Sequence, residues 1–173
     1  MASPDDLTHL GEQGRARMVD VSAKDVSVRE AVAEGWVRVA PATLALIRAG
    51  ASHKGDVLAV AQVAGIMGAK ATSTLIPLCH PLPLSGIDLR FALQDDPPAV
   101  HITATVRTTA RTGVEMEALT AVSVAALTVY DMCKAVDKEM IVEGVQVVYK
   151  SGGRSGVIDR RSSSPDDAGP ASR

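Results

Sequence analysis

The chain has 173 residues and a formal net charge of −2 at pH 7, with 46% hydrophobic and only 2% aromatic residues. This length fits one domain, and the hydrophobic share is enough to form a core. Negative charge and few aromatic rings argue against a nucleic-acid binder, which needs cations and stacking platforms. No apolar run approaches the ~20 residues that span a bilayer, and the N-terminus does not resemble a secretory signal. We therefore expect a soluble cytoplasmic protein that binds neither nucleic acid nor a membrane.

Both ends of the chain are polar and lack the periodicity of packed elements. Residues 1–17 are polar and acidic in part, and residues 158–173 are rich in Ser, Asp and Pro. Such segments bury too little apolar surface to order themselves. The sequence therefore predicts a flexible N-terminus over 1–17, a single folded domain over 18–157 and a disordered tail over 158–173.

The first half of the domain predicts a short strand followed by two helices. Residues 37–40 are typical of a strand, and Pro41 suits the first position of a helix over 42–48. Asp56 is placed to cap a second helix that extends to about Lys70.

The next segment predicts an antiparallel hairpin. Apolar residues alternate over 87–93 and again over 99–108, on either side of an Asp-Asp-Pro-Pro turn. Because side chains alternate between the two faces of a strand, we expect Ile87, Leu89 and Phe91 to lie on one buried face.

A long apolar helix is expected over 114–136, followed by a strand over 141–149. Residues 118–130 carry no charge, so this helix should be buried on all sides, in a core or in a subunit interface. Helices packed on one face of an antiparallel sheet make an α+β domain.

Charged residues gather at the two ends of the long helix. Thr112-Gly113-Val114-Glu115 fits a capping box, which gives Glu115 a structural role at the helix N-terminus. Asp131 opposes the helix dipole near the C-terminus, and Lys134, three residues later, is placed to pair with it. The pattern fits a proton-transfer pair and a plain ion pair equally well.

The segment 75–84 contains three prolines and a single polar point, Cys79-His80. A rigid loop that presents one imidazole suits binding or acid–base chemistry, although a lone His among apolar residues is more often structural. A zinc site from Cys79, His80 and Cys133 is a weaker alternative, because adjacent residues are poor ligands for one tetrahedral ion. Reduced thiols are the simpler interpretation of both cysteines.

Several cations lie beside turn residues. Lys54 precedes the second helix, Lys70 closes it, and Lys150 and Arg154 flank a glycine-rich segment that lacks the Gly-Lys-Ser/Thr ending of a Walker loop. A lysine just before a helix N-terminus helps to form a phosphate cradle. Each of these cations alone is also typical of an ordinary solvated side chain.

Together these segments resemble the cyclic pyranopterin monophosphate synthase family, accessory protein C of molybdenum cofactor synthesis (MoaC). Leu-Cys-His-Pro-Leu and Gly-Val-Glu-Met-Glu-Ala-Leu-Thr are highly specific in combination. The matching stretches follow the family's order and spacing, at residues 18–22, 53–57, 75–82, 112–120, 130–136 and 150–156.

The resemblance implies a ferredoxin-like α+β fold and dimers assembled into a hexamer. It implies a lyase that turns a cyclised dihydro-GTP into cyclic pyranopterin monophosphate and releases pyrophosphate, with no cofactor and no metal. Two rival functions remain: a catalytically silent nucleotide- or pterin-binding module of the same fold, and a metal-dependent phosphohydrolase built on Glu115, Glu117 and Cys79-His80.

By position in the family motifs, the catalytic residues would be Asp131, Lys134 and Lys54. The residues implied to bind substrate are Leu78, Cys79, His80, Glu115, Met116, Glu117, Arg29, Lys70 and Lys150. Arg154 stands where some family members carry Lys, which keeps the charge but leaves an amine-specific role in doubt. Lys24 lies outside the matching stretches, so its replacement is expected to be nearly silent.

Overall fold

The computed structural model describes residues 15–50, 55–153 and 156–161, and within them five strands and three helices. In chain order these are β1 (Ser27–Arg38), α1 (Pro41–Arg48), α2 (Val57–Leu75), β2 (Leu84–Asp95), β3 (Pro98–Ala110), α3 (Glu115–Cys133), β4 (Ile141–Ser151) and β5 (Ile158–Asp159). The strands form one antiparallel sheet in the order β2-β3-β1-β4-β5.

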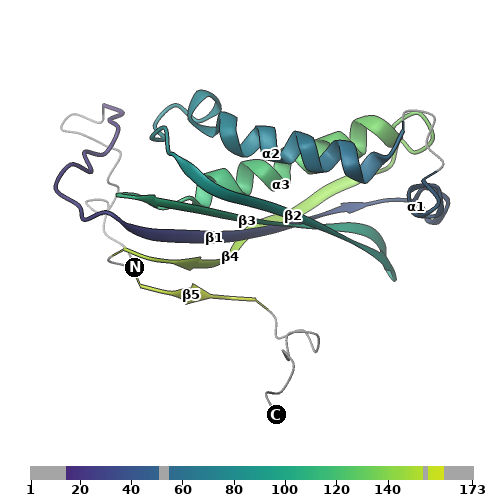
Figure 1. Cartoon of the computed structure of the whole chain (residues 1–173). Helices are drawn as coiled ribbons and strands as arrows, with labels where there is room; N and C mark the ends of the chain where they lie inside the picture. The colour runs from purple at the N-terminus through teal and green to yellow at the C-terminus, as the bar shows by residue number, and fades with distance from the viewer. Residues whose placement is uncertain (1–14, 51–54, 154–155, 162–173) are drawn as a thin grey trace, which may run out of the picture.

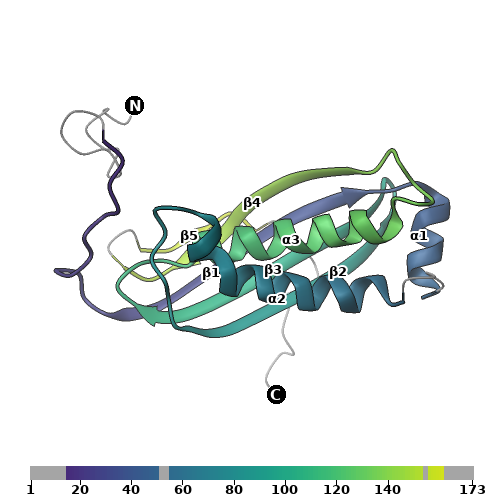
Figure 2. The same ribbon diagram turned by 90° about the horizontal axis from the view of Figure 1, so that it is seen from above.

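The architecture confirms the α+β, ferredoxin-like prediction. β1, α2, β2, β3, α3 and β4 follow the βαββαβ pattern of that fold, with β1 and β3 inside the sheet. Figure 1 shows α2 and α3 covering one face of the sheet, with α1 at one end, and Figure 2 shows the two long helices side by side over the strands. The core lies between this helix layer and the sheet.

The predicted hairpin is confirmed, and its strands are longer than expected. Leu89 pairs with Ala104 and Phe91 with Ile102 in the antiparallel register of β2 and β3. Leu89 is buried, and Ile87 and Phe91 are half-buried against the core. The alternation of the sequence therefore selects the face that meets the helices.

The first strand was predicted at 37–40, which is wrong in its extent. β1 spans Ser27–Arg38, and Ala40 is already the N-cap of α1. The inward positions include Ala31, Ala33 and Gly35, small residues that give no clear apolar alternation. Gly35 is small because Val122 of α3 lies against it: a Cβ there would come within 2.8 Å of Val122 Cγ1.

Both early helices form as expected. Pro41 is the first residue of α1, and the Asp56 carboxylate accepts hydrogen bonds from the N–H groups of Leu58 and Ala59 at the start of α2. α2 continues beyond Lys70 to Leu75, where the helix ends because Ile76 precedes a proline and adopts an extended backbone.

α2 and α3 pack closely and in opposite directions. A Cβ on Gly65 would lie 2.9 Å from Ala121 O, and one on Gly68 would lie 2.8 Å from Val124 Cγ2. Glycine at these two positions therefore sets the short separation between the helices. Because the helices are antiparallel, the start of α2 lies at the end of the layer where α3 finishes (Figure 2).

α3 is shorter than predicted and is not buried on all sides in one chain. It spans Glu115–Cys133, and its inner face, which includes Ala121 and Ala125, is fully buried. Leu127 is 61% exposed on the other side. By length and composition α3 is the one helix among the described residues that could cross a membrane, but core helices of soluble proteins pass the same test.

The chain remains ordered slightly beyond the predicted domain end. Ile158 and Asp159, which the sequence assigns to the tail, form β5 and pair with Lys150 and Tyr149 of β4. Residues 1–14 and 162–173 lie outside the described residues, so the flexible N-terminus and the disordered remainder of the tail stay predictions.

Candidate functional site

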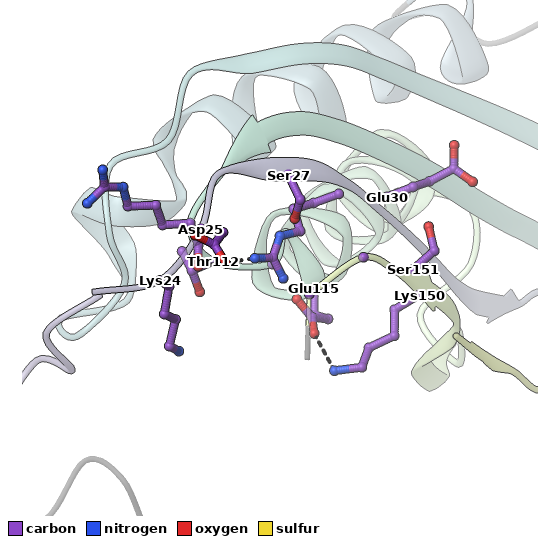
Figure 3. Close-up of a pocket in the computed structure, with 13 residues that line it drawn as sticks. Lys24, Asp25, Ser27, Glu30, Thr112, Glu115, Lys150 and Ser151 are labelled. Atoms are coloured by element: carbon purple, nitrogen blue, oxygen red, sulfur yellow. Dashed lines mark hydrogen bonds and ion pairs between the residues drawn. The ribbon is translucent and has the colours of Figure 1, made fainter. Parts of the chain in front are cut away.

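A large cavity lies at the end of the sheet where β1 begins, β3 and β4 end and α3 starts. It encloses about 660 Å³, and its walls come from residues 24–30, 111–115 and 150–153. Figure 3 shows the side chains of Lys24, Glu115 and Lys150 around this opening. Three segments far apart in the sequence therefore form one pocket, whose lining contains both cations and carboxylates. We call it the basic cavity.

Arg29 lines the basic cavity and is held there by hydrogen bonds to the backbone. It is only 9% exposed, and its guanidinium donates hydrogen bonds to the carbonyl oxygens of Ala110 and Arg111. Gly152 and Gly153 have positive φ angles of 93° and 76°, and a Cβ on Gly153 would collide with the guanidinium. The glycine-rich exit from β4 is thus required both by its backbone conformation and by the close approach of Arg29.

Lys150 and Glu115 form an ion pair in the lining of the basic cavity. Lys150 Nζ donates to Glu115 Oε1 over 2.8 Å, and the two side chains are 25% and 31% exposed. This pair joins the end of β4 to the first turn of α3 and leaves a cation at the cavity wall (Figure 3).

A second cavity of about 280 Å³, which we call the inner cavity, shares several walls with the first. Lys24, Thr112 and Glu115 line both cavities. The residues of the Leu-Cys-His loop and the start of α3 complete the inner cavity: Leu78, Cys79, His80, Met116 and Glu117. The structure thereby brings eight of the nine sequence-predicted binding residues to these two adjoining cavities.

Glu117 is a buried acid in the lining of the inner cavity. It is 4% exposed, and burial raises the pKa of its carboxyl group, with a further contribution from the negative charge of Glu115. Burial also raises the pKa of the Cys79 thiol, and Glu117 adds to this effect. Cys79 is therefore a neutral thiol near neutral pH, and Glu117 takes up a proton more readily than an exposed glutamate does.

Lys70, the ninth predicted binding residue, lines a third cavity, which shares Glu117 with the inner cavity. This cavity of about 200 Å³ is lined by Lys70, Ser73, Leu82 and Glu117, together with other residues of α2 and the proline-rich loop. Glu117 and Leu82 also line the inner cavity, so Lys70 adds a cation beside the same acid.

Asp131 and Lys134 lie at the opposite end of α3. Lys134 Nζ is 2.6 Å from Asp131 Oδ1, which confirms the predicted pairing, and each side chain is more than half exposed. The hydrogen bond that Lys134 donates to Asp131, together with the negative charge of Asp131, raises the pKa of Lys134. At 1.5 Å per residue, Glu117 and Asp131 are separated by about 21 Å along the helix, so one chain does not bring them together.

The predicted capping box is wrong. α3 begins after Val114, which is the N-cap and has no side chain that can cap, and Glu115 is the first helical residue rather than the third. Glu115 instead pairs with Lys150, so its carboxylate faces the basic cavity. The local motif was misleading because the Glu115 side chain forms an ion pair with Lys150, which is distant in sequence, and does not cap the helix.

Lys54 and Arg154 lie outside the described residues, so their predicted roles are untested by the geometry. Within the described ranges, no three His, Cys, Asp or Glu side chains are close enough together to hold a metal ion. The alternative zinc site is not formed there: Cys79 lines the inner cavity, whereas Cys133 is buried at the other end of α3.

Several residues of the basic cavity were missed by sequence reasoning. Lys24 lines both cavities, and Arg111 and Ser27 line the larger one. The Ser27 hydroxyl is the one buried polar side-chain atom among the described residues without a hydrogen-bond partner. The structure gives no basis for the expectation that replacing Lys24 has little effect. Lys24 lies outside the family motifs in sequence, but in the fold it lines the same cavities as the motif residues.

The chain is similar to proteins with an assigned function. The model of the MoaC family matches residues 18–153. A protein of Brevibacillus brevis named cyclic pyranopterin monophosphate synthase is 64% identical over 156 residues, which is 90% of this chain and 97% of the relative. Proteins with the same name from Roseiflexus and Pelotomaculum thermopropionicum are 62% and 60% identical, over 87% and 90% of this chain and 96% and 91% of their own lengths.

Proposed function

Because the chain belongs to the MoaC family, we propose that it converts cyclised dihydro-GTP (3',8-cyclo-7,8-dihydro-GTP) to cyclic pyranopterin monophosphate and pyrophosphate, in molybdenum cofactor biosynthesis. The reaction needs no oxidant, because the substrate supplies every atom of both products. The purine ring is rearranged into a pyranopterin, a cyclic phosphate closes on the α-phosphorus, and the bond to the β-phosphate breaks.

The observation that carries this proposal is the pair of adjoining cavities with different chemistry. The basic cavity offers Arg29, Lys150 and Lys24 to a triphosphate. The inner cavity offers His80, the buried acid Glu117 and the apolar side chain of Met116 to a ring with hydrogen-bonding edges. A ligand with a polyanionic tail and a heterocyclic head matches both.

We propose acid–base catalysis by Asp131, Lys134 and Lys54, which makes the protein a lyase. Asp131 holds Lys134 in its charged form, so Lys134 enters the reaction as a proton donor or as a fixed cation. Lys54 precedes α2, whose start lies near the end of α3, and in this proposal supplies the second ammonium group.

A composite site follows from the separation of these residues. No side chains bridge the ~21 Å between Glu117 and Asp131. Two copies packed in opposite directions about a twofold axis would bring the cavities of one chain to Asp131 and Lys134 of the other. The exposed Leu127, in the second half of α3, would be covered in the same contact. We propose such dimers as the active unit, assembled further into a hexamer in the cytoplasm.

The function is tested by incubating the purified protein with cyclised dihydro-GTP and measuring the fluorescent pterin that forms after oxidation. We expect pterin to accumulate both with and without EDTA. A silent binding module would bind the nucleotide and form no pterin. A metal-dependent phosphohydrolase would release phosphate without pterin and stop when EDTA is added. Either result would refute the proposal.

A further inference from the structure

A buried carboxylate lies just beyond the Asp131–Lys134 pair, in the loop between α3 and β4. Asp137 is only 6% exposed and is not part of any cavity wall described above. A buried charge is costly unless several hydrogen bonds satisfy it, so its partners indicate what it does.

Hydrogen bonds to the Asp137 carboxylate come from two backbone N–H groups and one side-chain hydroxyl at this end of the molecule. Oδ2 accepts from Ala40 N over 2.7 Å and from Thr43 Oγ1 over 3.0 Å, and Oδ1 accepts from Glu139 N over 3.1 Å. Burial by itself would raise the pKa of Asp137, but the hydrogen bonds from Ala40, Glu139 and Thr43 outweigh it and lower that pKa. The group is therefore an ionised acceptor at neutral pH.

The contacts with Ala40 and Thr43 place this charge at the N-terminus of α1. Ala40 is the N-cap of α1, and its side chain makes no capping hydrogen bond. An anion at this point complements both the unpaired N–H groups and the helix dipole. Asp137, 97 residues from Ala40 in sequence, thus accepts from the N–H of the N-cap residue of α1, whereas Asp56 accepts from N–H groups inside the first turn of α2.

The same residue is tied to the last turn of α3. Asp137 N donates to Cys133 O over 3.1 Å, and Val136 N donates to the same carbonyl over 2.9 Å. Lys134 lies inside this turn, and its own N–H donates to Tyr130 O over 2.9 Å. The side chains of Asp131 and Lys134 are mostly exposed, so their placement depends strongly on the backbone beneath them.

We propose that Asp137 is a positioning residue for Asp131 and Lys134, because its carboxylate clamps the turn after α3 to the start of α1. The clamp also fixes α1, the element that leads into the segment containing Lys54. The inference rests on the proposed catalytic role of Asp131 and Lys134. Asp137 touches no substrate in this account and acts only through the backbone.

The test compares Asp137→Ala with Asp137→Asn in the full-length protein. Asn keeps one oxygen that can accept from Ala40 N and Thr43 Oγ1, whereas Ala keeps none. For Asp137→Ala we expect kcat to fall about tenfold to a hundredfold with KM changed less than about twofold, since a shift of about 1 Å at a reacting group costs this much. Asp137→Asn should recover most of kcat.

Two further variants separate positioning from stability. Thr43→Val removes one hydrogen bond to the clamp at nearly constant volume and should reduce kcat by a smaller factor in the same direction, so it remains informative if Asp137→Ala does not fold. Glu139→Ala removes an exposed carboxylate from the same loop and should leave kcat unchanged. A purely structural role would lower the melting temperature of Asp137→Ala while each folded molecule kept its full kcat, which would overturn the proposal.

Amide hydrogen exchange tests the clamp without any turnover. We expect faster exchange across residues 131–137 in Asp137→Ala, with the central sheet unchanged. Unchanged exchange at 131–137 would overturn the proposal even in an active enzyme. If the wild-type protein formed no pterin, the proposed function would fail, and the positioning role would fail with it, whereas the exchange data would still decide whether the clamp exists.

Discussion

The ammonium group of Lys150, near the end of β4, donates a hydrogen bond to the carboxylate of Glu115, the first residue of α3, with 2.8 Å between Nζ and Oε1. Both groups line the basic cavity together with Arg29. The contact therefore joins two segments of the site and holds a cation where the triphosphate is proposed to bind.

Replacing Lys150 with Ala should raise KM for the substrate about tenfold or more, because a charge-assisted contact to phosphate contributes about 1.5–3 kcal/mol. The free energy of unfolding should change by less than about 1 kcal/mol, since partly exposed ion pairs contribute little to stability. Steady-state kinetics and urea unfolding measure the two effects. Lys24→Ala should also raise KM, because Lys24 lines the same cavity.

A charge swap distinguishes ligand binding from a structural ion pair. In the double variant Lys150→Glu with Glu115→Lys, the two side chains still attract each other, but the cation moves to the other wall. We expect activity to stay low. Wild-type KM in the swapped protein would mean that the pair serves only the fold.

The buried acid Glu117 should cost stability at neutral pH. Because burial raises its pKa in the folded chain, the unfolded chain releases this proton first as pH rises. The free energy of unfolding therefore decreases as pH rises from the ordinary pKa of a glutamate to the raised pKa of Glu117 in the folded chain. The Gln side chain in Glu117→Gln cannot ionise, so this variant should unfold at a higher urea concentration than the wild type at pH 7. The expected gain in the free energy of unfolding is about 0.5–2 kcal/mol.

The difference should shrink toward zero near pH 4, where the wild-type carboxyl group is protonated in both states. The same variant should lose most of its turnover. An equal stability gain at every pH would show that ionisation of Glu117 is not the cause.

Asp131→Asn, Lys134→Ala and Lys54→Ala should each abolish measurable turnover while circular dichroism shows an intact fold. Asp131 raises the pKa of Lys134, so in Asp131→Asn the Lys134 ammonium should lose its proton at lower pH than in the wild type, which NMR titration can measure. Lys138→Ala, an exposed lysine of the following loop, is the matched control and should keep its rate. A near-normal rate in Asp131→Asn would assign the acid a structural role.

The sequence predicted the parts of the fold whose signals are local. The hairpin at Leu89 and Phe91, the Asp56 cap and the proline at the start of α1 all depend on residues close together in the chain. β1 was mostly missed because its inner positions are Ala and Gly, whose small size is explained only by the helix above them.

The candidate site was predicted from the resemblance to family motifs, and the structure adds the contacts between residues that are distant in sequence. Lys24 and Arg111 enter the basic cavity because the start of β1 lies beside the end of β3. The Glu115–Lys150 pair replaced an expected capping box, since the partner lies 35 positions away. No sequence motif predicts the hydrogen bonds of Asp137, because its partners Ala40 and Thr43 are common residues that only the fold brings close to it.

Subunit mixing tests the composite site. Glu117→Ala and Asp131→Asn proteins should each be inactive alone, and a mixture that exchanges subunits should regain activity, because some heterodimers carry one intact site. At equal concentrations and full random exchange, half of all dimers are heterodimers with one intact site each, so about a quarter of the wild-type activity is expected. Mass spectrometry of the mixture confirms the exchange. No recovery despite proven exchange would contradict the shared site.

The most direct measurement of the proposed function is the ratio of pyrophosphate to pterin released from cyclised dihydro-GTP by the purified protein in EDTA. We predict one pyrophosphate for each pterin throughout the time course, and neither product with Asp131→Asn protein. Pyrophosphate or phosphate in excess over pterin, or the absence of both products with the wild-type protein, would contradict it.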